Sequence, residues 1–285
     1  MKVLSLFSGI GGLDAGFEQN GFEIVWANDF DKYAVETYKA NYKSPITLGD
    51  INSIPLDSLP DFDILIGGFP CQPFSMMGSE LGFEDTRGTL FFRIAEIIKH
   101  KIDEGKKPKA VILENVRTLR THDKGRTFKT IKRILTEELG YCVFDSVLNT
   151  ADYGIPQTRN RTYIVCFAND AADFSFPQKQ ELTLTLQDLL EQNVDDKYFL
   201  SATILPTILS DGTGGYKAKS EIDLKVARPL CATMAKMHRA FKTLSQACRY
   251  QQICSRRTVS DTRFTSKYGI RLLTTFAGGR ELFLP

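Results

Sequence analysis

A single cysteine in a glycine- and proline-rich loop is the residue of this chain best suited to act as a nucleophile. Residues 67–75 read GGFPCQPFS and follow the short apolar segment 64–66, which is typical of a buried strand. Two prolines and two glycines shape this loop, so Cys71 is presented where substrates bind. Its thiolate would be stabilised by nearby cationic groups or by a following helix N-terminus. Cys142 and Cys166 lie within apolar segments and are expected to be small buried hydrophobic residues.

A carboxyl group and two arginines could complete a catalytic site around this thiol. Glu114 follows the apolar segment 110–113, and a carboxyl group in a partly dry pocket favours the protonated form that a proton donor needs. Arg159 and Arg161 are two residues apart in an extended stretch, so they project to the same side and could hold a phosphate or a base. Taken singly, the carboxylate also fits a helix or turn cap, and the arginine pair also fits a solvated surface.

A glycine-rich turn near the N-terminus could hold a small ligand. Residues 7–14 read FSGIGGLD, between a short apolar segment and an amphipathic one. Glycines let the backbone approach a ligand closely, and the amides at the start of a helix bind polar groups. The dinucleotide-binding pattern GxGxxG is not met, because counting from Gly9 it needs glycine where Asp14 stands. The turn therefore indicates either a ligand loop without a pyrophosphate cradle or a plain strand-to-helix turn.

Two later turns could supply the rest of a nucleoside pocket. Asp29 ends the next apolar segment and could accept hydrogen bonds from ribose hydroxyls, while Phe30 could stack on a purine. Asp50, followed by Ile51, could accept a hydrogen bond from an adenine amino group. Each piece alone fits an ordinary turn or helix cap. Together, in this order along the chain, they predict a pocket for a nucleoside.

The pattern of apolar residues predicts an α/β fold with a doubly wound, mainly parallel sheet. Amphipathic stretches at helical spacing separate most of the apolar segments, so strands and helices alternate. We expect a catalytic domain over residues 1–180 and a smaller recognition region over residues 181–285. The predicted strands are 3–7, 24–27, 64–66, 110–113, 141–148 and 163–167, and the predicted helices are 32–40, 89–101 and 127–138.

Composition indicates in which cellular compartment the protein acts and which kinds of partner it has. The 285 residues carry a net charge of only +2, so a nucleic-acid partner would have to be bound by a local basic surface. The six cysteines form no CxxC pair, which argues against both a structural zinc site and a disulfide framework, and no metal is expected. No segment has the length of a signal-peptide core or a membrane span. We expect a soluble, cytoplasmic protein without a membrane partner.

The order of these motifs resembles that of the DNA (cytosine-5) methyltransferases of bacterial modification systems. The resemblance covers residues 1 to about 170, and residues 228–230 also match the family. Its most specific motifs are PCQ at 70–72, ENV at 114–116 and QTRNR at 157–161. It implies that Cys71 is the nucleophile and that Glu114, Arg159 and Arg161 activate the base. It also implies that S-adenosyl-L-methionine is the cofactor, leaving as S-adenosyl-L-homocysteine. The residues that match cofactor-contacting positions are Phe7, Gly9, Gly11, Leu13, Asp29, Phe30, Asp50, Ile51 and Phe69.

The resemblance further implies a reaction on a cytosine flipped out of double-stranded DNA, with residues 75–88 as a loop that closes over it. We expect a monomer, paired in function with a restriction endonuclease acting on the same site. Two alternatives stay open: a catalytically inactive remnant that binds DNA, and a cytosine-5 methyltransferase acting on RNA. An NAD-dependent oxidoreductase is disfavoured by Asp14, and a cysteine hydrolase is disfavoured because no histidine stands in any motif.

The C-terminal part departs from the family pattern. Cys231 stands where the family commonly has threonine, and the Gly-Asn-Ser-Val segment that begins the family's last helix is absent. In the family this helix completes the cofactor pocket. We therefore expect a truncated recognition region, weaker cofactor binding and low or absent activity.

Overall fold

The computed structural model describes residues 1–70, 90–169, 173–190, 221–222, 224–229 and 243–244. The chain divides into two compact units. Of the described residues, those within Met1–Leu148 and Asn160–Gln178 belong to unit 1, and those within Asn149–Arg159 and Lys179–Tyr268 belong to unit 2. The segment 149–159 joins unit 2 through its contacts, a grouping that the alternation of strands and helices did not indicate. The roles assigned to residues 1–180 and 181–285 stay predictions.

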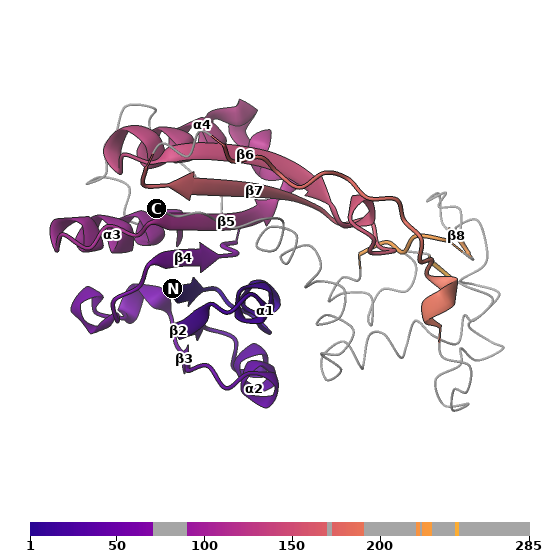
Figure 1. The fold of residues 1–285 in the computed structure, drawn as a ribbon, viewed down its shortest axis with the longest axis horizontal. Coiled ribbons are helices and arrows are strands. Elements are labelled where there is room, and N and C mark those ends of the chain that lie inside the picture. Colours follow the sequence, from indigo (N-terminus) through magenta and orange to yellow (C-terminus); the bar gives the residue numbers. More distant parts are fainter. Residues whose placement is uncertain (71–89, 170–172, 191–220, 223, 230–242, 245–285) are drawn as a thin grey trace, which may run out of the picture. The chain divides into compact units, whose positions relative to one another are not determined.

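Unit 1 is built on a seven-stranded sheet in the order β3-β2-β1-β4-β5-β7-β6 (Figure 1). The pairs β1–β2, β1–β4, β2–β3 and β4–β5 are parallel, whereas β7 runs antiparallel to β5. The predicted doubly wound, mainly parallel sheet is therefore confirmed. The strands are β1 (Lys2–Leu6), β2 (Glu23–Asp29), β3 (Ile46–Leu48), β4 (Ile64–Gly67), β5 (Ala110–Val116), β6 (Cys142–Asn149) and β7 (Asn160–Phe167).

Helices cover both faces of this sheet, and alternation along the strands decides which side chain meets which layer. In β1, Leu4 and Leu6 pack into the core formed with α3 and α4, while Val3 packs into the core formed with α1 and α2. In β7, Ile164 and Val165 divide between the two cores in the same way. The helices are α1 (Gly12–Gln19), α2 (Lys32–Asn41), α3 (Leu90–Asp103) and α4 (Arg126–Arg133), which continues as a π-helical turn (Ile134–Glu138).

The parallel register aligns the candidate loops along one edge of the sheet. Leu6 at the end of β1 lies opposite Asn28 of β2 on one side and opposite Gly67 of β4 on the other. Gly67 in turn lies opposite Leu113 of β5. The four loops that follow these residues therefore lie along one edge of the sheet, which is the edge where ligands bind in sheets of this kind.

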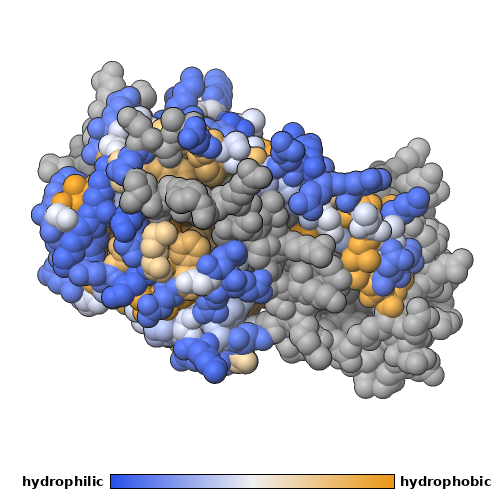
Figure 2. All heavy atoms as spheres, in the orientation of Figure 1, coloured by the Kyte–Doolittle hydropathy of each residue, from blue (hydrophilic) through white to orange (hydrophobic). Residues whose placement is uncertain are grey.

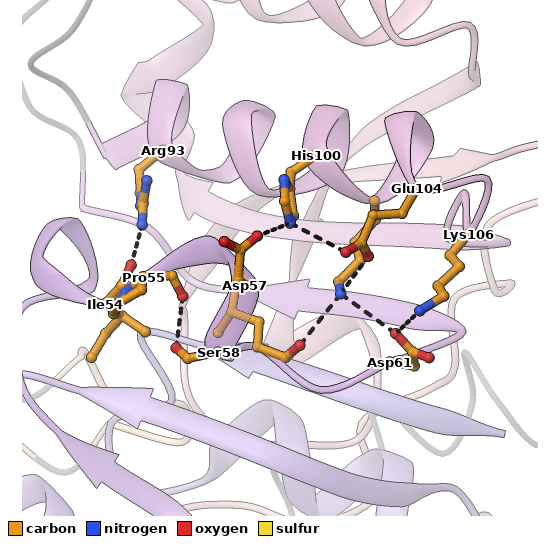
Figure 3. A network of polar contacts seen from close by, with 11 residues as sticks. Ile54, Pro55, Asp57, Ser58, Asp61, Arg93, His100, Glu104 and Lys106 are labelled. Carbon is orange, nitrogen blue, oxygen red and sulfur yellow. Dashed lines mark hydrogen bonds and ion pairs between the residues drawn. The ribbon is translucent and has the colours of Figure 1, made fainter.

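A network of polar contacts fixes α3 to the segment between β3 and β4, which contains the short helices η1 (Ile51–Ser53) and η2 (Leu56–Ser58) (Figure 3). The Arg93 guanidinium donates to the carbonyl oxygens of Ile51, at 3.1 Å, and Ile54. The buried Lys101 ammonium contacts the Leu59 carbonyl at 3.3 Å and the Glu104 carboxylate at 2.9 Å. These contacts set the position of the polypeptide around Asp50 and Ile51.

The described part of unit 2 brings two sequence motifs together. The Thr158 amide donates to the Ala227 carbonyl at 2.7 Å, and the Ala227 amide donates to the Pro156 carbonyl at 2.8 Å. The QTRNR segment thus pairs with the residues that precede Arg228. This unit also contains η7 (Thr150–Asp152), η8 (Gln187–Leu189), β8 (Glu221–Ile222) and β9 (Thr243–Leu244). In the part of the chain that the structure describes, no helix has the length and apolarity needed to span a membrane.

Candidate active site

The glycine-rich turn after β1 is held by the end of β2. The Gly9 amide donates to the Asp29 carboxylate at 2.8 Å, and the Ser8 amide donates to the Asn28 carbonyl at 3.0 Å. Phe7 and Gly9 have φ angles of 53° and 57°, in the left-handed region, so the chain turns away from the sheet immediately after β1. The first two of the three predicted pieces of the nucleoside pocket are therefore joined by hydrogen bonds.

Gly11 cannot be replaced without displacing Tyr42, the residue that follows α2. It has a φ of 91°, and a Cβ at this position would lie 2.3 Å from the ring of Tyr42. The Tyr42 hydroxyl donates to the Gly11 carbonyl at 2.9 Å, and its ring packs on Tyr38 with centroids 4.7 Å apart. A Cβ at Gly9, by contrast, would meet no atom of the described residues within 4 Å, so among these residues open space lies beside Gly9. Tyr42 thus supports the turn from the helix side, a role that the sequence pattern did not reveal.

Asp29 and Phe30 lie at the end of β2 with opposite exposure. The Asp29 side chain is buried, and its second oxygen accepts from the Asp31 amide at 2.8 Å. Each carboxylate oxygen has two lone pairs, so both keep one for a ligand. The Phe30 side chain is 73% exposed, which is unusual for a ring this large and leaves its face free to stack on a base.

The third piece of the pocket is tied to the second. The Asn28 side-chain amide donates to the carbonyls of Thr47 at 3.0 Å and Gly49 at 2.9 Å. Asp50 is exposed and caps η1 by accepting from the Asn52 amide at 3.0 Å, while Ile51 is buried. Asp50 can cap η1 and also bind a ligand, because the cap leaves lone pairs of the Asp50 carboxylate unused.

Glu114 and Arg161 form an ion pair at the carboxyl end of β5. The Arg161 Nε lies 2.7 Å from Glu114 Oε1, and both side chains are 20% exposed. Arg161 is carried by β7, whose antiparallel register places it opposite Val116. The other carboxylate oxygen, Oε2, lies 3.4 Å from the position that a Cβ on Gly68 would take. The carboxyl group is therefore oriented by an arginine and faces the backbone of the GGFPC loop.

The first residues of this loop are fixed by β5 as well. The Asn115 side-chain amide donates to the Phe69 carbonyl at 2.9 Å, and both side chains are buried. The Phe69 ring packs on Phe91 of α3 with centroids 5.9 Å apart. Pro70 is the last described residue before Cys71. Cys71 itself, and the predicted closing loop 75–88, lie outside the described residues.

The remaining predicted residues have different surroundings. Leu13 and Phe7 are half-buried and pack against the two hydrophobic cores of unit 1. Arg159 belongs to unit 2, where its amide donates to the side chains of Asn149 and Thr150 at 3.0 Å. The structure thus joins Glu114 to Arg161 in unit 1 but describes Arg159 in another unit. The catalytic and cofactor-binding roles of all these residues stay predictions.

Asp14 carries a buried carboxyl group. In the sequence, this residue served only to exclude the dinucleotide-binding pattern. It lies in the first turn of α1 and is fully buried. One oxygen accepts from the Tyr38 hydroxyl at 2.9 Å, and the other has no hydrogen-bond partner among the described residues. Burial raises the pKa of Asp14 from 3.8 to about 6. Nothing in the sequence around position 14 distinguished this aspartate from an exposed one.

We predict that Asp14→Asn flattens the dependence of stability on pH. Because the folded-state pKa of Asp14 is raised, the folded state binds more protons than the unfolded state between pH 3.8 and about 6, so the free energy of unfolding falls as pH rises through this window. The difference between the wild type and the variant should change by about 3 kcal/mol across it. Urea unfolding at a series of pH values measures this difference. A difference that does not change with pH would refute the prediction.

One group of possible metal ligands occurs among the described residues, away from the sheet edge. It consists of Asp57, His100 and Glu104, whose ligand atoms lie within 4.8 Å of one another. The His100 Nε2 lies 3.2 Å from Asp57 and 3.5 Å from Glu104. Both carboxylates are at the surface, and Glu104 also pairs with Lys101, so the group belongs to the polar network that fixes α3 (Figure 3).

Comparison with known proteins places the chain in a family. The model of the C-5 cytosine-specific DNA methylase family matches residues 1–278. The type II methyltransferase M.NgoBI of Neisseria gonorrhoeae is 51% identical over 205 residues, which are 71% of this chain and 62% of that protein. M.HaeII of Haemophilus aegyptius is 50% identical over 202 residues, 70% of this chain and 61% of that protein. The chain thus spans less than two thirds of the length of these relatives.

Solved structures show the same fold at lower identity. The Dnmt2 methyltransferase of S. pombe superposes with a TM-score of 0.68 at 18% identity, over 96% of this chain and 94% of that one. The methyltransferase EhMeth of Entamoeba histolytica gives a TM-score of 0.67 at 20% identity, over 96% and 92%. The motif order, the sheet topology and the family match agree, and the chain belongs to the C-5 cytosine-specific DNA methylase family.

Proposed function

We propose that this chain transfers a methyl group from S-adenosyl-L-methionine to carbon 5 of cytosine in double-stranded DNA. The observation that carries the proposal is the Glu114–Arg161 ion pair, 2.7 Å long, beside the loop that leads into Cys71. An oriented carboxyl group at this edge can act on the pyrimidine ring that the thiol attacks. The membership of the chain in the C-5 cytosine-specific DNA methylase family supports the same assignment.

The residues present fit the cofactor. S-adenosyl-L-methionine supplies an electrophilic methyl group on a sulfonium. The Phe30 ring is exposed for stacking on adenine, Asp29 keeps lone pairs for the ribose hydroxyls, and the space beside Gly9 leaves room for the rest of the molecule. The absence of a pyrophosphate cradle agrees with a ligand that has no phosphate. We propose the cofactor-binding set Phe7, Gly9, Gly11, Leu13, Asp29, Phe30, Asp50, Ile51 and Phe69.

In the proposed reaction the Cys71 thiolate attacks C6 of a flipped-out cytosine, and an S–C6 bond forms. Glu114 donates its proton to N3 as the electron pair of the C5–C6 double bond moves towards C5. C5 then bonds to the methyl group while the bond between that group and the sulfonium sulfur breaks, and N3 returns its proton to Glu114. A base removes the C5 proton, the double bond re-forms and the thiolate leaves. Flipping the base costs a few kcal/mol, offset by contacts in the pocket. Arg161 keeps Glu114 in place, and Arg159 is proposed to contact the ring carbonyl.

We predict that Asp29→Ala weakens the binding of S-adenosyl-L-methionine by about 10- to 100-fold. The variant removes the acceptor for the ribose and also releases the Gly9 amide, and a hydrogen bond to a charged group contributes about 1.5–3 kcal/mol. Isothermal titration calorimetry measures the dissociation constant. Glu36→Ala removes an exposed carboxylate from the neighbouring helix α2 and should leave it unchanged. Equal affinities for the two variants would contradict the assignment of Asp29.

Bisulfite sequencing of DNA and RNA from cells that express the chain tests the proposed function. We expect cytosines protected at one recurring DNA sequence, and none with Cys71→Ala. Protection in RNA alone would establish the RNA alternative, and protection in neither would contradict the proposal. The DNA pattern would also give the sequence that a functionally paired endonuclease should recognise. The monomeric state stays a prediction, and so does the effect of the C-terminal departures from the family pattern. These departures concern Cys231 and residues 245–285, which lie outside the described residues.

A further inference from the structure

A strongly basic segment follows the strand that carries Glu114. Residues 117–133, named here the basic ridge, contain seven lysines and arginines and one acidic residue, Asp123, in a chain whose net charge is only +2. The ridge begins directly after β5, the strand that carries Glu114, and includes α4. Hydrophilic side chains cover the upper margin of unit 1, where Figure 1 places α4 (Figure 2).

The apolar side of the ridge is fixed in the core, so its cations must face outward. Phe128 and Ile131 of α4 are buried against the sheet. Four of the seven cations pair with carboxylates: Arg120 and Lys132 with Asp145, Arg126 with Asp123, and Arg133 with Glu138. Three others are exposed and have no carboxylate within ion-pairing distance among the described residues: Arg117, Lys124 and Lys129.

The turn that presents Lys124 has a defined and strained backbone. Asp123, Lys124 and Gly125 have φ angles of 51°, 54° and 84°, all in the left-handed region, which a lysine rarely adopts. Two contacts hold the turn. The His122 Nδ1 lies 2.7 Å from the Thr127 hydroxyl, and Asp123 and Arg126 form an ion pair 2.5 Å long. Strain of this kind persists only when the surroundings enforce it, and it is concentrated at functional sites.

We propose that the basic ridge binds the phosphate backbone of duplex DNA beside the target cytosine, with Arg117, Lys124 and Lys129 as its contacts. This inference rests on the proposed function, because it takes DNA as the substrate. Unpaired cations in a fixed arrangement release counterions from DNA without reading bases. Arg117 follows Val116, at the sheet edge where Glu114 lies, so the bound strand would run past the catalytic groups.

The test compares two double variants that remove the same charge from exposed lysines. Lys124→Gln with Lys129→Gln changes the ridge, and Lys39→Gln with Lys43→Gln changes α2 and the residues after it. Binding of a random-sequence duplex is measured by filter retention over a series of salt concentrations. The logarithm of the binding constant falls as the logarithm of the salt concentration rises, and each lost phosphate contact makes this slope shallower by about 0.9. The ridge variant, which loses two contacts, should therefore have a slope that is shallower by about two. Its KM for DNA should rise while kcat at saturating DNA stays within about twofold of the wild type.

The outcomes separate this inference from the proposed function. A ridge variant whose salt slope equals that of the α2 variant overturns the ridge, whether or not the chain methylates DNA. A wild type that binds duplex DNA through the ridge but transfers no methyl group overturns the proposed function alone. Retention of structured RNA but not of duplex DNA by the wild type overturns both. Equal thermal melting of the two variants shows that neither change acts through folding.

Discussion

Cys71→Ala is expected to lower the rate of methyl transfer to duplex DNA by at least about 10⁴-fold, because removing a catalytic nucleophile leaves only binding and orientation. Alanine cannot form the S–C6 bond, and without that bond C5 of cytosine is too poor a nucleophile to accept the methyl group. Transfer of radiolabelled methyl groups from the cofactor measures the loss. Cofactor affinity should change little, since the pocket residues around Asp29 are untouched.

Two other cysteines provide matched controls. Cys166 is fully buried in β7, and burial raises the pKa of its thiol, so it is an inert core residue. Cys142 is half-buried at the start of β6, and Cys142→Ala should leave the rate within about twofold of the wild type, as expected for a residue without a catalytic role. A comparable loss in Cys71→Ala and Cys142→Ala would indicate impaired folding rather than loss of the nucleophile.

Glu114→Gln is the second change with a large expected effect, a fall in kcat of about 10²- to 10³-fold, within the range for general acid catalysis. Glutamine has nearly the same shape and can still accept a hydrogen bond from Arg161, but it cannot deliver a proton to N3 of cytosine. KM for DNA should change much less than kcat, because the lost interaction strengthens only as the ring becomes electron-rich. Steady-state kinetics on duplex DNA separate the two parameters.

The ion pair also predicts how the two residues combine. If Arg161 acts by orienting Glu114, Arg161→Ala should lower kcat in the wild type but have little further effect in the Glu114→Gln background. Additive effects would show that Arg161 acts on the substrate independently. An unchanged kcat in Glu114→Gln would remove the carboxyl group from the mechanism.

Much of the fold follows from the sequence because β-strand alternation and helical spacing are local signals. The strand β4 and the first four residues of β5 were predicted, since both are continuous apolar segments, whereas β5 extends through the polar residues Glu114 and Asn115 to Val116. The strand β3 was not predicted: its three residues give no periodicity, and pairing with β2 makes it a strand. The helix α1 was indicated only as an amphipathic stretch, because three glycines within residues 9–12 weaken the helical signal at its start.

The candidate site was predictable where a residue stands in a motif and unpredictable where it acts through a neighbour. Glu114 and Arg161 were expected at one edge, and the structure pairs them. The contact of Tyr42 with Gly11 could not be expected, because Tyr38 and Tyr42 are four residues apart in the sequence and resemble an ordinary core stripe. The exposure of Lys124 depends on a left-handed turn that no local composition specified. Tertiary contacts decide all such positions.

The central claim is a covalent bond between Cys71 and the target base, and a duplex carrying 5-fluorocytosine at the recognised position tests it most directly. Fluorine at C5 cannot leave as a proton does, so the thiolate cannot be expelled after methyl transfer and the adduct should persist. With the cofactor present, we expect a denaturation-resistant complex of chain and DNA, with the modified peptide containing Cys71. No adduct on a duplex whose unmodified form is methylated, or an adduct on another residue, would contradict the account.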